Sequence, residues 1–122
     1  MEPADLVAAA KRLLADADAG IGATSLLAAA LLLRQAVEEV IGAVWDERLP
    51  AMRDVSGRAQ HITLPYFVDA ETAKALTYAW NRLSELCHHG AGPSNWLSAV
   101  ELRALVALAK QATDQPVAGR AL

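Results

Sequence analysis

The stretch Ser25–Arg48, SLLAAALLLRQAVEEVIGAVWDER, decides the fold. Its apolar residues recur every three or four positions, which is the spacing of one face of an α-helix and not the alternation of a strand. Alanine and leucine, both strong helix formers, supply most of it. Thr24 or Ser25 is placed to cap this helix, and Pro50 follows its end. The positions that we expect to be buried are Leu26, Leu27, Leu31, Leu33, Val37, Val40, Ile41 and Val44.

The segments on either side carry the same signal. We predict helices over about residues 4–19, 69–89 and 98–112, with Asp69 as the N-cap of the second. Ser98 and Glu101 have the S-x-x-E spacing of a capping box at the start of the last helix. Gly57 and Pro65 break the connection 52–68, in which Ser56 can cap a short helix.

These helices predict an all-α fold, an antiparallel four-helix bundle with a short extra helix in the central connection. We expect residues 1–113 to form a single helical domain and residues 114–122 to form a flexible C-terminal tail. A chain of 122 residues is long enough for one core and too short for two.

Composition excludes several classes of function. The net charge of -3 argues against a protein that coats DNA by neutralising phosphates. The single cysteine, Cys87, fits a reducing compartment. The longest apolar run, Leu26–Leu33, is much shorter than the roughly 20 residues that cross a bilayer. We therefore expect a cytoplasmic protein with no membrane partner.

The sequence RLSELCHH, residues 82–89, carries the groups most suited to chemistry. On a regular helix Arg82, Glu85 and His89 align at i, i+3 and i+7, whereas His88 lines up with Glu85. If the helix frays at Gly90, either histidine can turn toward Arg82. The choice between His88 and His89 stays open.

An arginine beside an imidazole can cleave RNA without a metal or a cofactor. The imidazole removes a proton from the ribose 2′-hydroxyl or donates one to the leaving 5′-oxygen. The guanidinium of Arg82 holds the phosphate and stabilises the charge that develops. Glu85 can pair with Arg82 or orient an imidazole. The candidate catalytic residues are therefore Arg82, Glu85, His88 and His89.

The same residues also have a simpler explanation. Arginine and histidine on an exposed helical face are usually solvated, and a histidine near a helix C-terminus is favoured by the helix dipole. Cys87, His88 and His89 are consecutive and cannot easily converge on one zinc ion, so we expect no metal site.

The segment resembles the R-x4-6-H motif of the HEPN superfamily of small helical domains: Arg82 to His88 is R-x5-H, and Arg82 to His89 is R-x6-H. Residues 31–39, LLLRQAVEE, look like the R-x-A-L/V-E pattern of an early HEPN helix. Residues 79–84, 87–89 and 98–102 look like an actinobacterial HEPN subfamily. The resemblance covers about residues 22–110.

This resemblance implies a homodimer in which two such helices face each other across a shared cleft. It implies a metal-independent endoribonuclease of a toxin or defence system, with an antitoxin or another partner protein. The alternative is a non-catalytic HEPN module that binds a nucleotide or a protein through the same surface. Leu83 favours this alternative, because HEPN nucleases usually carry a polar residue after the arginine.

Three features lie outside the motif. Arg34 and Glu38, at i and i+4, are expected to form an intrahelical ion pair, or by resemblance to support the Arg–His site. His61 is expected at the surface of the central connection. The local cluster of positive charge, a weak candidate for contact with RNA, consists of Arg48, Arg53 and Arg58.

Overall fold

The computed structural model describes residues 2–16, 23–89 and 99–114. The four long helices are α1 (Pro3–Asp16), α2 (Ala23–Arg48), α4 (Ala70–His89) and α5 (Ala99–Asp114). Three short helical segments, η2 (Pro50–Asp54), α3 (Gly57–Thr63) and η3 (Leu64–Tyr66), lie between α2 and α4. Within the described ranges there is no strand, so the predicted all-α class is confirmed.

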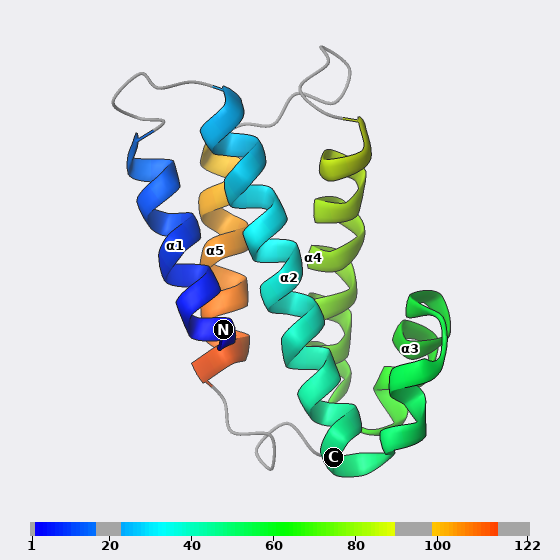
Figure 1. Cartoon of the computed structure of the whole chain (residues 1–122). Helices are drawn as coiled ribbons and strands as arrows, with labels where there is room; N and C mark the ends of the chain where they lie inside the picture. Colours follow the sequence, from blue (N-terminus) through cyan, green and yellow to red (C-terminus); the bar gives the residue numbers. More distant parts are fainter. Residues whose placement is uncertain (1, 17–22, 90–98, 115–122) are drawn as a thin grey trace.

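The long helices pack along one another. α2 contacts α1, α4 and α5, while α5 also contacts α1 and α4. In Figure 1, α1 and α4 run upward and α2 and α5 run downward, so helices that follow each other in the chain are antiparallel. The more specific prediction of a four-helix bundle stays a prediction.

The core follows the expected helical spacing. Val37, Val40, Ile41 and Val44 of α2 are all buried, and Trp45 is fully buried beside them. The indole of Trp45 meets the ring of Phe67 edge-on, with centroids 5.3 Å apart. The side chains that the other helices add to this core are Leu6, Val7, Ala10 and Leu14 of α1, Ala73, Leu76, Ala79, Leu83 and Leu86 of α4, and Leu105 and Val106 of α5.

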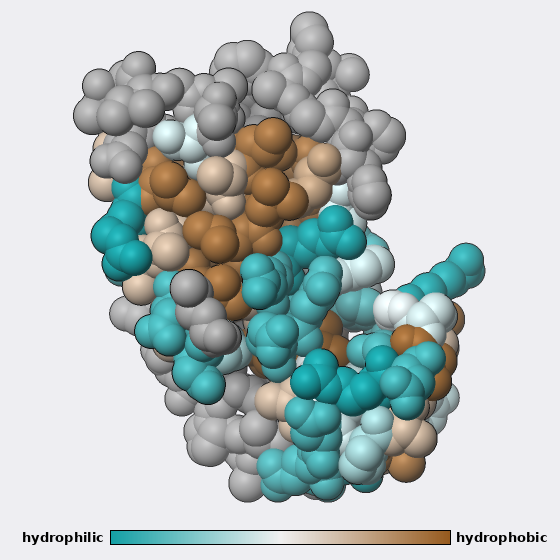
Figure 2. All heavy atoms as spheres, viewed as in Figure 1, coloured by the Kyte–Doolittle hydropathy of each residue, from teal (hydrophilic) through white to brown (hydrophobic). Residues whose placement is uncertain are grey.

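The two halves of α2 present different surfaces. Figure 2 shows hydrophobic side chains gathered over its first half and hydrophilic ones over its second half and over α3. Leu31, in the first half, is 51% exposed and was expected to be buried. The run 26–33 is apolar on every side of the helix, so one face must point away from the core.

Side-chain caps begin two of the described helices, α3 and α4. Asp69 caps α4 as predicted, since its Oδ1 accepts from the backbone N–H of Thr72 at 2.9 Å. Ser56 caps α3 through a bond from the N–H of Ala59 at 3.3 Å. α2 begins at Ala23, so Thr24 and Ser25 lie inside it and the predicted cap is wrong. Ser98, of the predicted capping box, falls outside the described residues.

The connection between α2 and α4 consists of the three short segments η2, α3 and η3. Pro50 is the first residue of η2 and Pro65 the second residue of η3, positions at which proline is tolerated because its missing N–H is not needed. Figure 1 shows α3 standing beside α2 and α4, apart from α1 and α5. The predicted short helix is confirmed.

None of the helices described has the length and apolar character needed to cross a membrane.

Candidate functional site

Helix α4 carries polar groups on two flanks of its buried face. Residues 80 and 82 are about 200° apart around a helix, so Trp80 and Arg82 lie on opposite sides of fully buried Leu83. Arg82 faces α5, and Trp80 faces α2 and α3. The two flanks are therefore separate candidate sites.

On the first flank, Arg82 is held by two carboxylates. Its Nε and Nη2 donate to both oxygens of Glu101 on α5, the second bond measuring 2.9 Å. Its Nη1 lies 3.4 Å from Oε1 of Glu85, one turn along α4. The side chains of Arg82 and Glu101 are only 22% and 26% exposed. The guanidinium is thus enclosed between α4 and α5.

These contacts fix the charges of the group. The bond to Glu101 raises the pKa of Arg82, and the reciprocal bond lowers the pKa of Glu101. Both groups are therefore ionised near neutral pH. A phosphate that binds Arg82 must compete with two carboxylates that already neutralise it.

The rest of the predicted catalytic set is placed only in part. α4 stays helical through His89, so the backbones of His88 and His89 form its last turn. Their side chains fall outside what the structure describes. Two roles were open to Glu85, pairing with Arg82 or orienting an imidazole. The structure shows it paired with Arg82.

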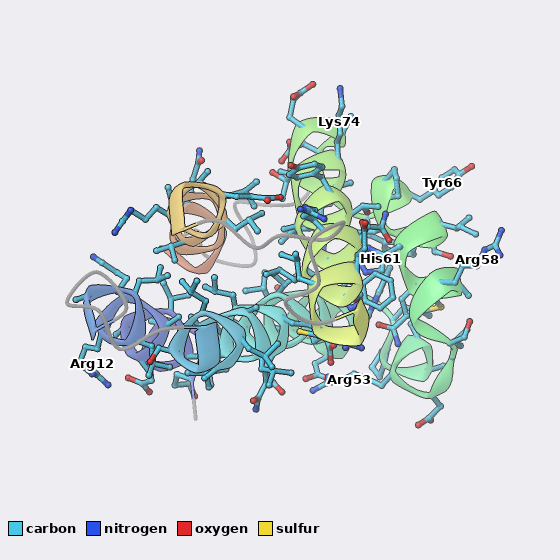
Figure 3. The ribbon with its side chains drawn as sticks, turned by 90° about the horizontal axis from the view of Figure 1, so that it is seen from above. Arg12, Arg53, Arg58, His61, Tyr66 and Lys74 are labelled. Carbon is cyan, nitrogen blue, oxygen red and sulfur yellow. The ribbon has the colours of Figure 1, made fainter. Side chains whose placement is uncertain are left out.

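The second flank borders a cavity of about 320 Å³ between α2, α3 and α4. Figure 3 shows His61 between α3 and α4 and Arg53 near the end of α2, whereas Arg58 and Tyr66 point away from the other helices. The cavity is lined by Arg34, Glu38, Ile41, Arg53, Gly57, Gln60, His61 and Trp80. We call it the α2–α3–α4 cleft.

Trp80 contacts three other residues that line this cleft. The imidazole of His61 packs on its indole with centroids 4.7 Å apart, and the guanidinium of Arg34 lies 5.9 Å from its ring centroid. The indole N–H donates to Oε1 of Glu38 at 3.4 Å. Nε of Arg34 donates to the same oxygen at 3.0 Å, so the predicted Arg34–Glu38 pair is confirmed. It faces Trp80 and is not in contact with Arg82.

A second arginine is fixed at the edge of the cleft. Nε and Nη2 of Arg53 donate to the two oxygens of Asp46 at 2.9 and 3.2 Å. The guanidinium lies directly over Gly42, where an added Cβ would come within 2.0 Å of its Nη1. Glycine at this position lets Arg53 lie flat against α2.

Burial sets the protonation states here. Burial lowers the pKa of His61, an effect that nearby Glu38 partly opposes, so the imidazole is neutral at pH 7. Its Nδ1 lies 3.0 Å from the hydroxyl of Thr77. Burial also raises the pKa of the Cys87 thiol, which keeps it protonated and a poor nucleophile.

The cleft presents groups that are suited to binding a ligand. Among the residues described, no three His, Cys, Asp or Glu side chains are grouped to hold a metal ion. Each of the two guanidiniums in the cleft is paired with a carboxylate, and an imidazole and an indole lie beside them. Such a surface offers donors, acceptors and aromatic faces to a small, planar, polar ligand.

No family model, curated protein or solved structure matches this chain. The resemblance to HEPN domains rests on the sequence pattern alone and is not tested by these comparisons.

Proposed function

We propose that this chain is a non-catalytic, HEPN-like helical module that binds a mononucleotide in the α2–α3–α4 cleft. The observation that carries the proposal is the cavity itself, which brings Arg34, Arg53, His61 and Trp80 to one opening. The alternative site, around Arg82, has its cation already engaged by Glu101.

Each part of a nucleotide has a chemical counterpart in the cleft. Guanidinium groups bind phosphate oxygens through paired charge-assisted hydrogen bonds, and Arg34 and Arg53 both keep N–H groups beyond those their carboxylates use. The aromatic pair of His61 and Trp80 offers surface for a base. Small-ligand pockets begin at about 300 Å³, so a cavity of about 320 Å³ suits a mononucleotide better than a longer chain.

Isothermal titration calorimetry with nucleoside 5′-monophosphates tests the proposal. We expect binding by the native protein and, for Arg53→Gln, a loss of about tenfold or more, since a charge-assisted bond is removed. Arg53 is exposed and its replacement should leave the fold intact. Failure of every nucleotide to bind with a dissociation constant below about 1 mM would reject the proposal.

A matched control separates the cleft from general attraction of anions. Arg12 is an exposed arginine of α1, and Figure 3 shows it on the opposite side of the molecule from Arg53 and His61. Arg12→Gln removes the same charge and should leave nucleotide affinity unchanged. Equal losses in both variants would point to non-specific electrostatic attraction.

The endoribonuclease is a second candidate function. It is favoured by the helical course of α4 through His89, which keeps Arg82, Glu85 and His89 at i, i+3 and i+7. In this case Arg82 must exchange Glu101 for the substrate phosphate, and a homodimer would bring two such helices together.

RNA cleavage in EDTA tests this second candidate. A nuclease should leave 2′,3′-cyclic phosphate ends and lose activity in folded Arg82→Ala and His89→Ala. Glu101→Gln should raise its rate, because the competing carboxylate is neutralised. Sedimentation analysis of the same samples measures whether the chain is a dimer. Absence of cleavage by every form would remove the nuclease and leave the nucleotide-binding proposal to its own test.

A further inference from the structure

Glu38 is held in an unusual way for an exposed carboxylate. Its Oε1 accepts from Arg34 on its own helix at 3.0 Å and from Trp80 on α4 at 3.4 Å. Both donors use the same oxygen. In the described part of the chain, Oε2 of Glu38 has no hydrogen-bond partner.

The free oxygen, Oε2 of Glu38, belongs to a side chain that a ligand can reach. Glu38 lines the α2–α3–α4 cleft, and its side chain is 49% exposed, so a bound molecule can reach it. Donors from two helices restrict its orientation before any ligand arrives, which reduces the entropy lost on binding. An ionised carboxylate accepts hydrogen bonds and cannot donate them.

The carboxylate that holds Arg53 differs from Glu38, because both of its oxygens accept hydrogen bonds. Asp46 uses both carboxylate oxygens on Arg53, one at 2.9 Å and one at 3.2 Å. Asp46 is also not among the residues that line the cavity. Of the two carboxylates that hold cleft arginines, Glu38 is therefore the one with an oxygen left for a ligand.

We infer that Glu38 makes the cleft selective for nucleotides whose base carries an exocyclic amino group, as guanine, adenine and cytosine do. This inference rests on the proposed nucleotide-binding function. The amino N–H donates to Oε2 of Glu38. A base with a carbonyl oxygen at that place brings two acceptors together and is disfavoured.

Two pairs of nucleotides test the selectivity by calorimetry. GMP and IMP differ only in the 2-amino group of the base, and CMP and UMP differ by an amino group against a carbonyl oxygen. We expect the native protein to bind the amino member of at least one pair about tenfold or more tightly, as a hydrogen bond to a charged group allows.

The substitution Glu38→Gln supplies the decisive comparison. Glutamine keeps the length of the side chain but presents both a donor and an acceptor, so the amino preference should fall to within about twofold. The ratio within a pair is the readout, because release of Arg34 from its partner can change the affinity for every phosphate equally. Glu47→Gln, an exposed carboxylate of α2 outside the cleft, should keep the native ratio.

The outcomes separate this inference from the function on which it rests. Nucleotides that bind without an amino preference, or a preference that survives in folded Glu38→Gln, overturn the role of Glu38 and leave nucleotide binding in place. No binding by any of these four nucleotides or by AMP overturns both.

Discussion

The guanidinium of Arg82 on α4 donates to both carboxylate oxygens of Glu101 on α5, and the pair joins the two helices at the edge of the core. The residue that sequence reasoning selected for catalysis is thus also part of the contact between these helices. Any loss of function on replacing Arg82 must be separated from loss of stability.

Arg82→Met should destabilise the protein by about 1–2 kcal/mol, measured by urea denaturation. Fully exposed ion pairs contribute about 0–1 kcal/mol, whereas breaking a buried pair costs about 3–5 kcal/mol. This pair is 22% and 26% exposed and has two parallel hydrogen bonds, which places it between those limits. Arg12→Met, at an exposed position of α1, should cost much less.

A double-mutant cycle with Glu101→Gln isolates the contact itself. If Arg82 and Glu101 stabilise each other, the double variant should lose less stability than the sum of the single variants. Strict additivity would show that the pair contributes nothing and that the single losses come from packing.

Glu101 should also make stability fall in acid. Its folded pKa lies below the ordinary value of 4.5 because Arg82 donates to its ionised form. The unfolded chain therefore takes up the proton first. The contribution is fully present above pH 4.5 and is lost as the pH falls through the folded pKa. Denaturation at a series of pH values should show a shallower acid loss in Glu101→Gln than in the native chain.

The control for this pH series is an exposed carboxylate away from Arg82. Glu47→Gln, at an exposed position of α2, should follow the native curve closely. Equal changes in both variants would attribute the acid loss to overall charge and not to the contact with Arg82.

His61 gives a second pH dependence in a higher range. Burial lowers its pKa below the ordinary value of 6.5, so the unfolded chain binds a proton before the folded chain does. Stability should therefore decline as the pH falls from 6.5 through the folded pKa. His61→Gln loses the stacking on Trp80 and is less stable overall, but its stability should change less over this range.

An NMR titration of the imidazole measures the same quantity directly. A midpoint for His61 at or above 6.5 in the folded protein would contradict the buried, neutral ring.

The parts of the fold that sequence predicts are those set by near neighbours. Asp69 and Ser56 cap helices through bonds to residues three positions away, and such spacing is visible in the chain. The buried face of α2 follows from a 3.6-residue period in the same way. Thr24 and Ser25 were misassigned because α2 begins at Ala23, before either of them, although both residue types favour the capping position.

The contacts of the candidate sites depend on residues far apart in sequence. Glu101 has the spacing of a capping box, which predicts a contact with Ser98 three residues earlier. Nothing in that spacing indicates the observed contact with Arg82. His61 meets Trp80 only because two 3-10 segments turn the connection back toward α4. Irregular segments have no period, so the sequence does not predict where they return.

Gly42→Ala should leave the protein as stable as before or stabilise it by up to about 1 kcal/mol, although the added Cβ would meet Nη1 of Arg53 at 2.0 Å. The atom in the way is the end of a flexible, exposed side chain, which can move aside. Its bridge to Asp46 is worth less than about 1 kcal/mol at this exposure. Alanine in a helix interior gains about 0.8–1.0 kcal/mol over glycine, so the two effects nearly cancel or favour alanine.

Nucleotide binding should respond in the opposite sense. Displacing Arg53 from its place over Gly42 removes a guanidinium from the cleft, so the affinity should fall as it does in Arg53→Gln while urea denaturation shows an intact fold. The double variant Gly42→Ala with Arg53→Gln should bind no more weakly than Arg53→Gln alone. A further loss in the double variant would show that the added methyl group disturbs α2 itself, because the effect could then not pass through Arg53.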